Sequence, residues 1–263
     1  EAKREEERGV PSMRRRFFPS WTPWLRAGVP GSVGKRRGTQ ETHVVRVALT
    51  GGPCAGKSSA LEHLRKDATE KGFDVYVAPE TASILFTSGC VWGGSEEYKI
   101  LLLSELMQMQ LQIEKTFTSI AAATGRPSIL ILDRGLLDNK GYASEASWSK
   151  ALQGLNESDP LYDINERTIL DRYDGVVHMC TAAKGAEKYY KWGWQTDDSG
   201  KKVYRRETPE QARELDDKMI RCWEQHPRQV IIENQPGKSF QIKLDAACGA
   251  VMHIALEKHP QQG

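Results

Sequence analysis

The sequence predicts an α/β fold of three layers, in which a five-stranded parallel sheet is covered by helices on both faces. Short apolar runs alternate with helical segments along the body of the chain, which is typical of such a sheet. A glycine-rich motif lies between the first apolar run and the first helical segment. Of the 263 residues, 39% are apolar and 27% are charged, and no apolar stretch has the length of a membrane span. An integral membrane protein is therefore excluded.

The predicted strands are buried on both faces, because their apolar residues are continuous rather than alternating. They cover 44–49, 73–78, 128–132, 175–179 and 229–233. Apolar residues at helical spacing predict helices between or after these strands. The predicted helices are the one that follows the first strand and ends at Gly72, and those over 96–123, 209–225 and 239–257.

The strongest signal is a phosphate loop, Gly-Gly-Pro-Cys-Ala-Gly-Lys-Ser-Ser, which matches GxxxxGK[ST] completely. Its glycines let backbone N–H groups surround a phosphate at the positive end of the following helix. Lys57 is predicted to reach the β- and γ-phosphates and Ser58 to ligate Mg²⁺. The predicted nucleotide-binding residues of the loop are Gly51, Gly52, Pro53, Cys54, Ala55, Gly56, Lys57, Ser58 and Ser59.

Charged residues follow the second and third predicted strands, at the sheet edge where ligands of such folds bind. Asp133 ends an apolar strand as a Walker B acid does, so we expect it to hold Mg²⁺ together with Ser58. Arg134 either contacts a phosphate or braces the acid. Glu80 is predicted to be the base that takes the proton from an acceptor hydroxyl; the alternative is a helix N-cap or solvated turn residue.

Residues 181–206 are predicted to form a lid, because they combine seven Lys and Arg residues with aromatic ones, among them Tyr189, Tyr190, Trp192 and Trp194. Basic residues on a lid neutralise the charge that develops on a triphosphate during transfer. The best candidates are Arg205 in a catalytic role, Arg206 in nucleotide binding, and Arg213. The alternative is a solvated charged loop.

Residues 1–42 are predicted to be an irregular basic arm ahead of a domain at 43–258, with a short tail at 259–263. Residues 1–40 hold ten Lys or Arg and four Glu, a net charge of +6, on a chain whose total is +2. A flexible tail, an organelle-targeting region and an arm that binds a protein or nucleic acid all stay open. In the last case Arg14–Arg16 would supply charge, and Trp21 and Trp24 would anchor the arm.

The five cysteines indicate a reducing compartment, since none forms a CxxC pair and their number is odd. We therefore expect the protein in the cytoplasm or in the matrix of a mitochondrion or plastid. Cys54, inside the phosphate loop, is interpreted as a small filler rather than a nucleophile.

Several motifs together resemble the NadR/Ttd-type P-loop AAA domain, whose members include the nicotinamide-riboside kinase domain of bacterial NadR. They are the phosphate loop, the Pro-Glu-Thr at 79–81, the Asp-Arg-Gly at 133–135, and the stretches 185–188 and 207–210. The resemblance covers 43–258 and implies a nucleoside-kinase-like P-loop NTPase fold with strand order 2-3-1-4-5. It also implies phosphate binding by 51–59, magnesium at Ser58 and Asp133, and lid contacts by Arg205 and Arg206. It implies no particular substrate.

Three functions stay open. The first is an ATP-dependent kinase or ATPase that acts on a small, nucleoside-like acceptor with Mg²⁺, with Lys57, Glu80, Asp133 and Arg205 as its catalytic residues. The second is a binding module controlled by ATP or GTP. The order of Asp138-Asn139-Lys140 is not that of the guanine-binding motif, although this does not exclude GTP. The third is a structural subunit of a larger assembly, tethered by the arm.

Overall fold

The structure is a computed structural model that describes residues 43–159, 163–196, 202–205 and 207–259, without the side chains of 195–196 and 202–205. The predicted arm at 1–42, the lid residue Arg206 and residues 260–263 lie outside this description. The proposed roles of the arm therefore stay predictions.

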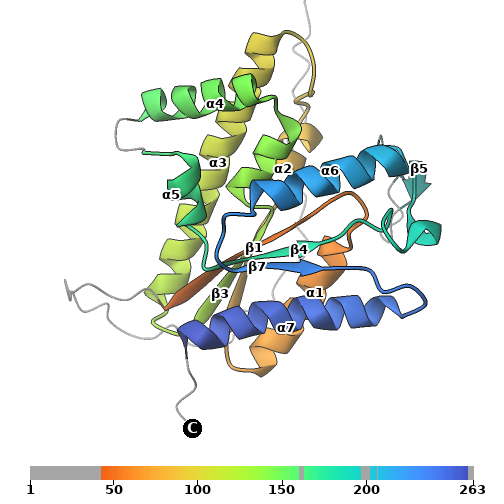
Figure 1. Cartoon of the computed structure of the whole chain (residues 1–263). Coiled ribbons are helices and arrows are strands. Elements are labelled where there is room, and N and C mark those ends of the chain that lie inside the picture. The colour runs from red at the N-terminus through yellow and green to blue at the C-terminus, as the bar shows by residue number, and fades with distance from the viewer. Residues whose placement is uncertain (1–42, 160–162, 197–201, 206, 260–263) are drawn as a thin grey trace, which may run out of the picture. The chain divides into compact units, whose positions relative to one another are not determined.

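A parallel sheet of five strands forms the centre of the body, as predicted (Figure 1). The strands are β1 (Val44–Gly51), β2 (Asp74–Ala78), β3 (Ser128–Asp133), β4 (Gly175–Met179) and β7 (Gln229–Ile232). Their order is β2-β3-β1-β4-β7. Because β5 and β6 pair only with each other, β7 is the fifth strand of this sheet, and the order corresponds to the predicted 2-3-1-4-5.

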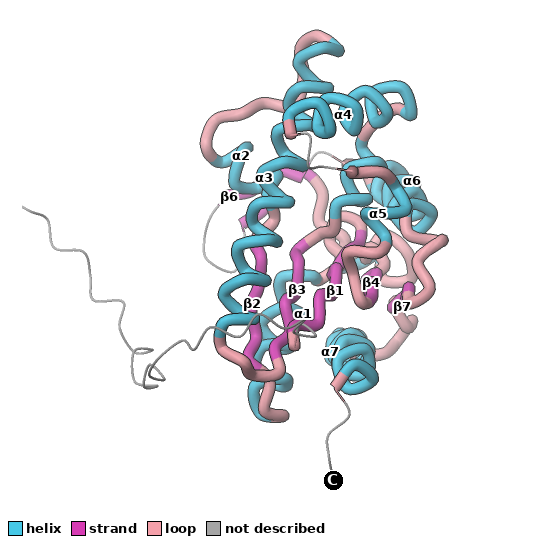
Figure 2. The backbone as a smooth tube through the Cα atoms, turned by 90° about the vertical axis from the view of Figure 1, so that its left-hand side faces the viewer, coloured by secondary structure: helices cyan, strands magenta, loops and turns pink. Residues whose placement is uncertain are grey.

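Helices cover both faces of the sheet, and β1 supplies apolar side chains to both. Val45, Val47 and Leu49 pack with α1 (Lys57–Glu70) and α7 (Phe240–Lys258) on one face. On the other face lie α3 (Glu96–Ala123), α4 (Glu145–Ser158), α5 (Glu166–Leu170) and the end of α6 (Pro209–Cys222). Figure 2 shows α3 along strands β2 and β3. The result is the three-layer arrangement that the alternating sequence predicts.

Local signals place the helix boundaries. Helix α3 has the predicted bounds, because the Ser95 side chain accepts a hydrogen bond from the Tyr98 amide at its start and a Gly-Arg-Pro stretch follows its end. Helix α6 begins with a capping box, in which Thr208 and Gln211 satisfy each other's backbone amides, and Pro209 occupies its first turn. It ends at Cys222, three residues before the predicted end.

Several short elements were not predicted from the sequence. They are α2 (Thr81–Thr87), α4, α5, the 3₁₀ helices η1 (Leu136–Tyr142) and η2 (Glu187–Tyr189), and the hairpin of β5 (Gly193–Thr196) and β6 (Lys202–Arg205). The hairpin and η2 lie within the predicted lid, so this segment contains regular structure. No helix in the described part of the chain is long and apolar enough to span a membrane.

Candidate nucleotide-binding site

The phosphate loop connects the carboxyl end of β1 to the first turn of α1. Gly56 precedes the helix with φ of 91°, a backbone conformation that favours glycine. A Cβ atom at this position would lie 2.5 Å from the Phe240 ring, so a larger residue would also have to displace that ring. Ser58 and Ser59 are exposed in the first turn of α1, where their hydroxyl groups are accessible to a ligand.

Lys57 lies at the centre of the site, half-buried. Its Nζ donates a long hydrogen bond to the Gly51 carbonyl (3.4 Å). Desolvation and, after it, the nearby Arg134 charge lower the pKa of Lys57 to about 8. The amine is therefore a cation that is incompletely neutralised by the protein, which suits it to a phosphate.

Asp133 ends β3 beside Leu49 of β1, as the register of the two strands shows. Its Oδ1 atom is buried and has no hydrogen-bond partner among the described residues. Burial raises the pKa of Asp133, and the Lys57 amine opposes this rise. Carboxylate and hydroxyl oxygens are ligand types that Mg²⁺ prefers. The unpaired Asp133 oxygen and the exposed Ser58 are therefore compatible with the predicted metal site.

Glu80 and Arg134 form an ion pair beside the phosphate loop. The Arg134 guanidinium donates from Nε to Glu80 Oε1 (2.5 Å) and from a terminal nitrogen to the Gly51 carbonyl (3.3 Å). Burial raises the pKa of Glu80, but the Arg134 charge and a hydrogen bond from Ser83 outweigh it and lower the pKa overall. Glu80 is therefore a carboxylate at neutral pH. It is also the N-cap residue of α2, the alternative raised from the sequence.

Asp138 is a member of this network that the sequence interpretation missed. Its Oδ1 atom accepts hydrogen bonds from the Thr50 hydroxyl (2.6 Å) and the Trp223 indole (2.7 Å), while Oδ2 lies 3.9 Å from Arg134. Asp138 thereby connects β1, η1 and the end of α6 behind the ion pair. Its position after two leucines and before a polar pair was the only local signal, and it also fits an ordinary turn.

The predicted lid cations separate into two groups. Lys184 pairs with Asp216 (2.9 Å) and Asp217 (2.6 Å) on α6, and Arg213 donates to the Ala183 carbonyl (3.0 Å). These two residues therefore hold α6 in place, and a contact of Arg213 with a triphosphate stays a prediction. Arg205 lies in β6, where its backbone pairs with Gly193, but its side chain and the whole of Arg206 lie outside the described residues.

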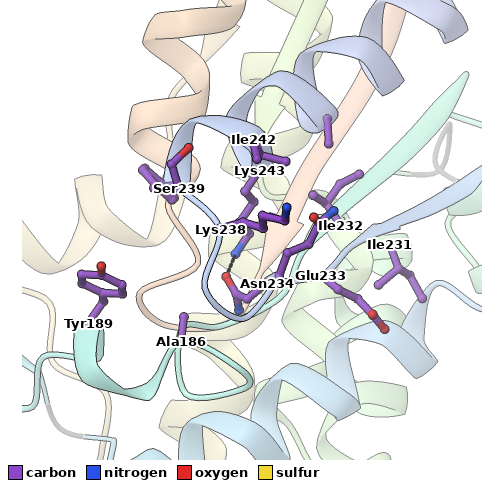
Figure 3. Close-up of a pocket in the computed structure, with 13 residues that line it drawn as sticks. Ala186, Tyr189, Ile231, Ile232, Glu233, Asn234, Lys238, Ser239, Ile242 and Lys243 are labelled. Atoms are coloured by element: carbon purple, nitrogen blue, oxygen red, sulfur yellow. Dashed lines mark hydrogen bonds between the residues drawn. The ribbon is translucent and has the colours of Figure 1, made fainter.

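A cavity of about 320 Å³ adjoins the phosphate loop, between η2 and the β7–α7 connection (Figure 3). Phe240, which packs against Gly56, lines it. The buried Lys243 amine also lines it and donates to the Cys180 carbonyl (2.5 Å) and Asn234 Oδ1 (2.8 Å). Burial lowers the pKa of Lys243 to about 8. The cavity has the size and the mixed lining of a site for a nucleotide base.

A second cavity, of about 220 Å³, lies between the start of α3 and the start of α4. Tyr142 lines it, and the Arg134 guanidinium carbon lies 5.7 Å from the centre of the Tyr142 ring. Tyr142 therefore belongs both to the lining of this cavity and to the surroundings of Arg134. The lining residues are Trp92, Glu96, Lys99, Leu103, Tyr142, Ala143, Ser144 and Ser147.

His178, Cys180 and Asp216 bring three potential metal ligands within 4.8 Å of one another, all buried. They do not fit a metal site. Burial raises the pKa of Cys180 to about 11, so it is a thiol at neutral pH. Asp216 already accepts bonds from Gly52, Thr181 and Lys184 and contacts His178.

Comparison with known proteins supports the fold. A family described as an AAA domain matches residues 46–239, more than half of the chain. The crystal structure of NadR protein in complex with NAD and AMP-PNP is similar, with a TM-score of 0.51 at 15% identity. The likeness covers 81% of this chain but 50% of NadR, so this chain spans about half the length of that protein. At such identity the likeness shows a shared fold.

A thymidylate kinase from Ehrlichia chaffeensis gives a TM-score of 0.48 at 12% identity, over 80% of this chain and 98% of the kinase. No curated protein matches the sequence.

Proposed function

The chain is a member of the AAA domain family, and from this premise we infer that it is a phosphotransferase that moves the γ-phosphoryl group of ATP to a hydroxyl group of a small, nucleoside-like acceptor. One observation carries the proposal. Arg134 holds the Glu80 carboxylate in its ionised form beside the phosphate loop, through hydrogen bonds to Glu80 and to the Gly51 carbonyl. An ionised carboxylate in this position can accept a proton from an incoming hydroxyl group, and the lowered pKa makes it a weaker base than an unpaired glutamate.

The transfer assigns a role to each of these groups. The loop amides and Lys57 bind the β- and γ-phosphates, while Glu80 accepts the proton of the acceptor hydroxyl. The acceptor oxygen forms a bond to the γ-phosphorus, and the bond from that phosphorus to the bridging oxygen breaks, so ADP leaves. Mg²⁺, held by Ser58 and Asp133, would neutralise charge on the phosphate oxygens. Arg205 and Arg206 stay candidates for lid contacts.

The two cavities support the placement of two ligands. The base of ATP would occupy the cavity beside Phe240 and Lys243, next to the phosphate loop. The acceptor would occupy the second cavity, whose Tyr142 ring faces Arg134. The aromatic rings of Trp92 and Tyr142 suit a flat ring system.

A screen of nucleosides tests the proposal, with ADP formation as the measurement. We expect one acceptor class to stimulate ADP formation and Glu80→Gln to lower kcat about 100-fold with little change in the KM for ATP. Glu105→Gln, at an exposed position on α3, is the matched control and should keep full activity. The proposal fails if no acceptor stimulates turnover and Glu80→Gln has no effect.

A nucleotide-controlled binding module is the second candidate, favoured by the aromatic surface of the lid. Tyr189, Trp192 and Trp194 are 63%, 57% and 71% exposed. Such residues are typical anchors of a protein partner. Binding of ATP or GTP without turnover, together with a partner lost on Trp194→Ala, would favour the module over the enzyme.

A further inference from the structure

A carboxylate from helix α6 contacts the phosphate loop. Asp216 is 0% exposed, and its Oδ1 atom accepts hydrogen bonds from the backbone amides of Gly52 (2.9 Å) and Thr181 (3.0 Å). The His178 Nε2 atom lies 3.1 Å from the same oxygen, and Lys184 donates to Oδ2 (2.9 Å). Four groups from three parts of the chain therefore converge on one side chain.

The close approach of Asp216 explains a glycine that the phosphate-loop motif does not require. The motif leaves its second position open, yet this chain has Gly52 there. A Cβ atom on Gly52 would lie 2.7 Å from Asp216 Oδ1 and 3.1 Å from its Cβ, both backed by the packed helix. Any side chain at position 52 would displace the carboxylate from the amide that it binds.

Further hydrogen bonds hold the loop beyond Gly52. The Thr181 hydroxyl donates to the Pro53 carbonyl (2.5 Å), and the Ala182 amide donates to the Cys54 carbonyl (3.3 Å). The position of Thr181 is itself fixed by the hydrogen bond that its backbone amide donates to Asp216. The segment from Gly52 to Cys54 is thus held directly by Asp216 and indirectly through residues 181–182.

We propose that Asp216 is a positioning residue for the phosphate loop, which fixes the path of Gly52–Cys54 so that the following amides face the phosphates of the nucleotide. The proposal rests on the proposed function only in assuming that the loop binds a polyphosphate. Asp216 acts through Gly52 and Thr181 and does not touch the nucleotide.

Direct binding measurements on the full chain test this role. Mg-ATP, inorganic tripolyphosphate and adenosine are titrated into the wild type, Asp216→Ala and Asp217→Ala. Asp217 is the matched control, because it shares Lys184 with Asp216 but is 53% exposed and makes no hydrogen bond to the loop among the described residues. We expect Asp216→Ala to weaken the binding of ATP and tripolyphosphate about tenfold, which corresponds to the loss of a hydrogen bond to a charged group. Adenosine, which does not reach the loop, should bind with unchanged affinity. The affinities of Asp217→Ala should stay within about twofold of the wild-type values.

The remaining outcomes separate this role from general stability. If the role of Asp216 were merely structural, Asp216→Ala would weaken the binding of adenosine as much as that of tripolyphosphate. Equal affinities of Asp216→Ala and Asp217→Ala for tripolyphosphate would also overturn the proposal. Should Asp216→Ala fail to fold by circular dichroism, Asp216→Asn decides, because its amide oxygen keeps the acceptor without the charge. About threefold weaker tripolyphosphate binding than in Asp217→Asn supports the proposal, and equal binding overturns it. A wild type that binds neither ATP nor tripolyphosphate would instead refute the proposed function.

Discussion

The buried charges of the site differ in how completely they are neutralised. Glu80 pairs with Arg134 and Asp216 with Lys184, so each of these carboxylates has a cation within hydrogen-bond distance. Lys57 has only a long bond to a carbonyl. A partly desolvated cation without a close anion is costly, and the cost is relieved when a phosphate binds.

At the residue scale, the lowered pKa of Lys57 predicts pH-dependent binding of ATP. The cation binds phosphate best, and its pKa of about 8 means that a rise in pH removes the proton in the free protein. We expect the Kd for ATP to be constant below pH 7.5 and to rise about tenfold per pH unit above 8. Calorimetric titrations between pH 6.5 and 9.5 measure this.

Two variants assign the effect. Lys57→Met should bind ATP weakly and without this pH dependence. Lys243→Gln removes another amine whose pKa is about 8. This variant should keep the pH dependence of ATP binding. A wild-type profile that stays flat to pH 9.5 would contradict the role of Lys57.

At the scale of elements, predictability from the sequence followed the strength of local signals. Helix α3 was predicted with its bounds because 28 residues repeat at helical spacing between a capping serine and a Gly-Arg-Pro stop. Helix α4 was missed because Gly154 and Asn156 favour turns, and its buried face offers few apolar residues, chiefly Trp148, Ala151 and Leu155. Tertiary packing, which the sequence does not display, stabilises it.

The packing of α4 predicts a large loss of stability when Trp148 is truncated. Trp148 is 1% exposed and its indole donates to Glu166 Oε1 (2.9 Å). Trp148→Ala should lower the free energy of unfolding by about 3–5 kcal/mol, because it leaves a cavity. Urea unfolding measures the loss. Lys150→Ala, exposed on the same helix, should change it by less than about 0.5 kcal/mol; similar effects of the two would show that α4 does not pack as described.

The site itself was predictable only where the residues are close in sequence. The phosphate loop and the acids at the ends of β2 and β3 could be proposed from the sequence, since each lies at the end of a recognisable strand. Asp216 was missed because it lies 164 residues from the amide of Gly52 and sits within an ordinary amphipathic helix. Such a partner becomes visible only when the fold brings α6 against β1.

At the scale of the whole molecule, Asp216 predicts a loss of stability in acid. Hydrogen bonds and charges from His178 and Lys184 outweigh burial and lower the pKa of Asp216 from 3.8 to about 2. A carboxylate with a lowered pKa stabilises the folded state fully above its unfolded pKa and loses this contribution as pH falls to about 2. The contribution is roughly 2 kcal/mol. The other charged neighbour, Asp217, shares Lys184 and lies at the surface.

Urea unfolding between pH 5.5 and 2.5 measures this contribution. The stability difference between wild type and Asp216→Asn should shrink by roughly 2 kcal/mol over this interval. Asp217→Asn, the surface control, should show a nearly constant difference. A gap between wild type and Asp216→Asn that does not change with pH would contradict a lowered pKa.

The central position of β1 has a consequence during protein synthesis. Its two neighbours in the sheet, β3 and β4, are translated long after it, and the carboxylate that holds Gly52 follows later still, on α6. Domains with such distant pairings cannot close until the late segments have left the ribosome. The nascent chain therefore carries a complete GxxxxGK[ST] motif for most of its translation without the support that gives this loop its shape.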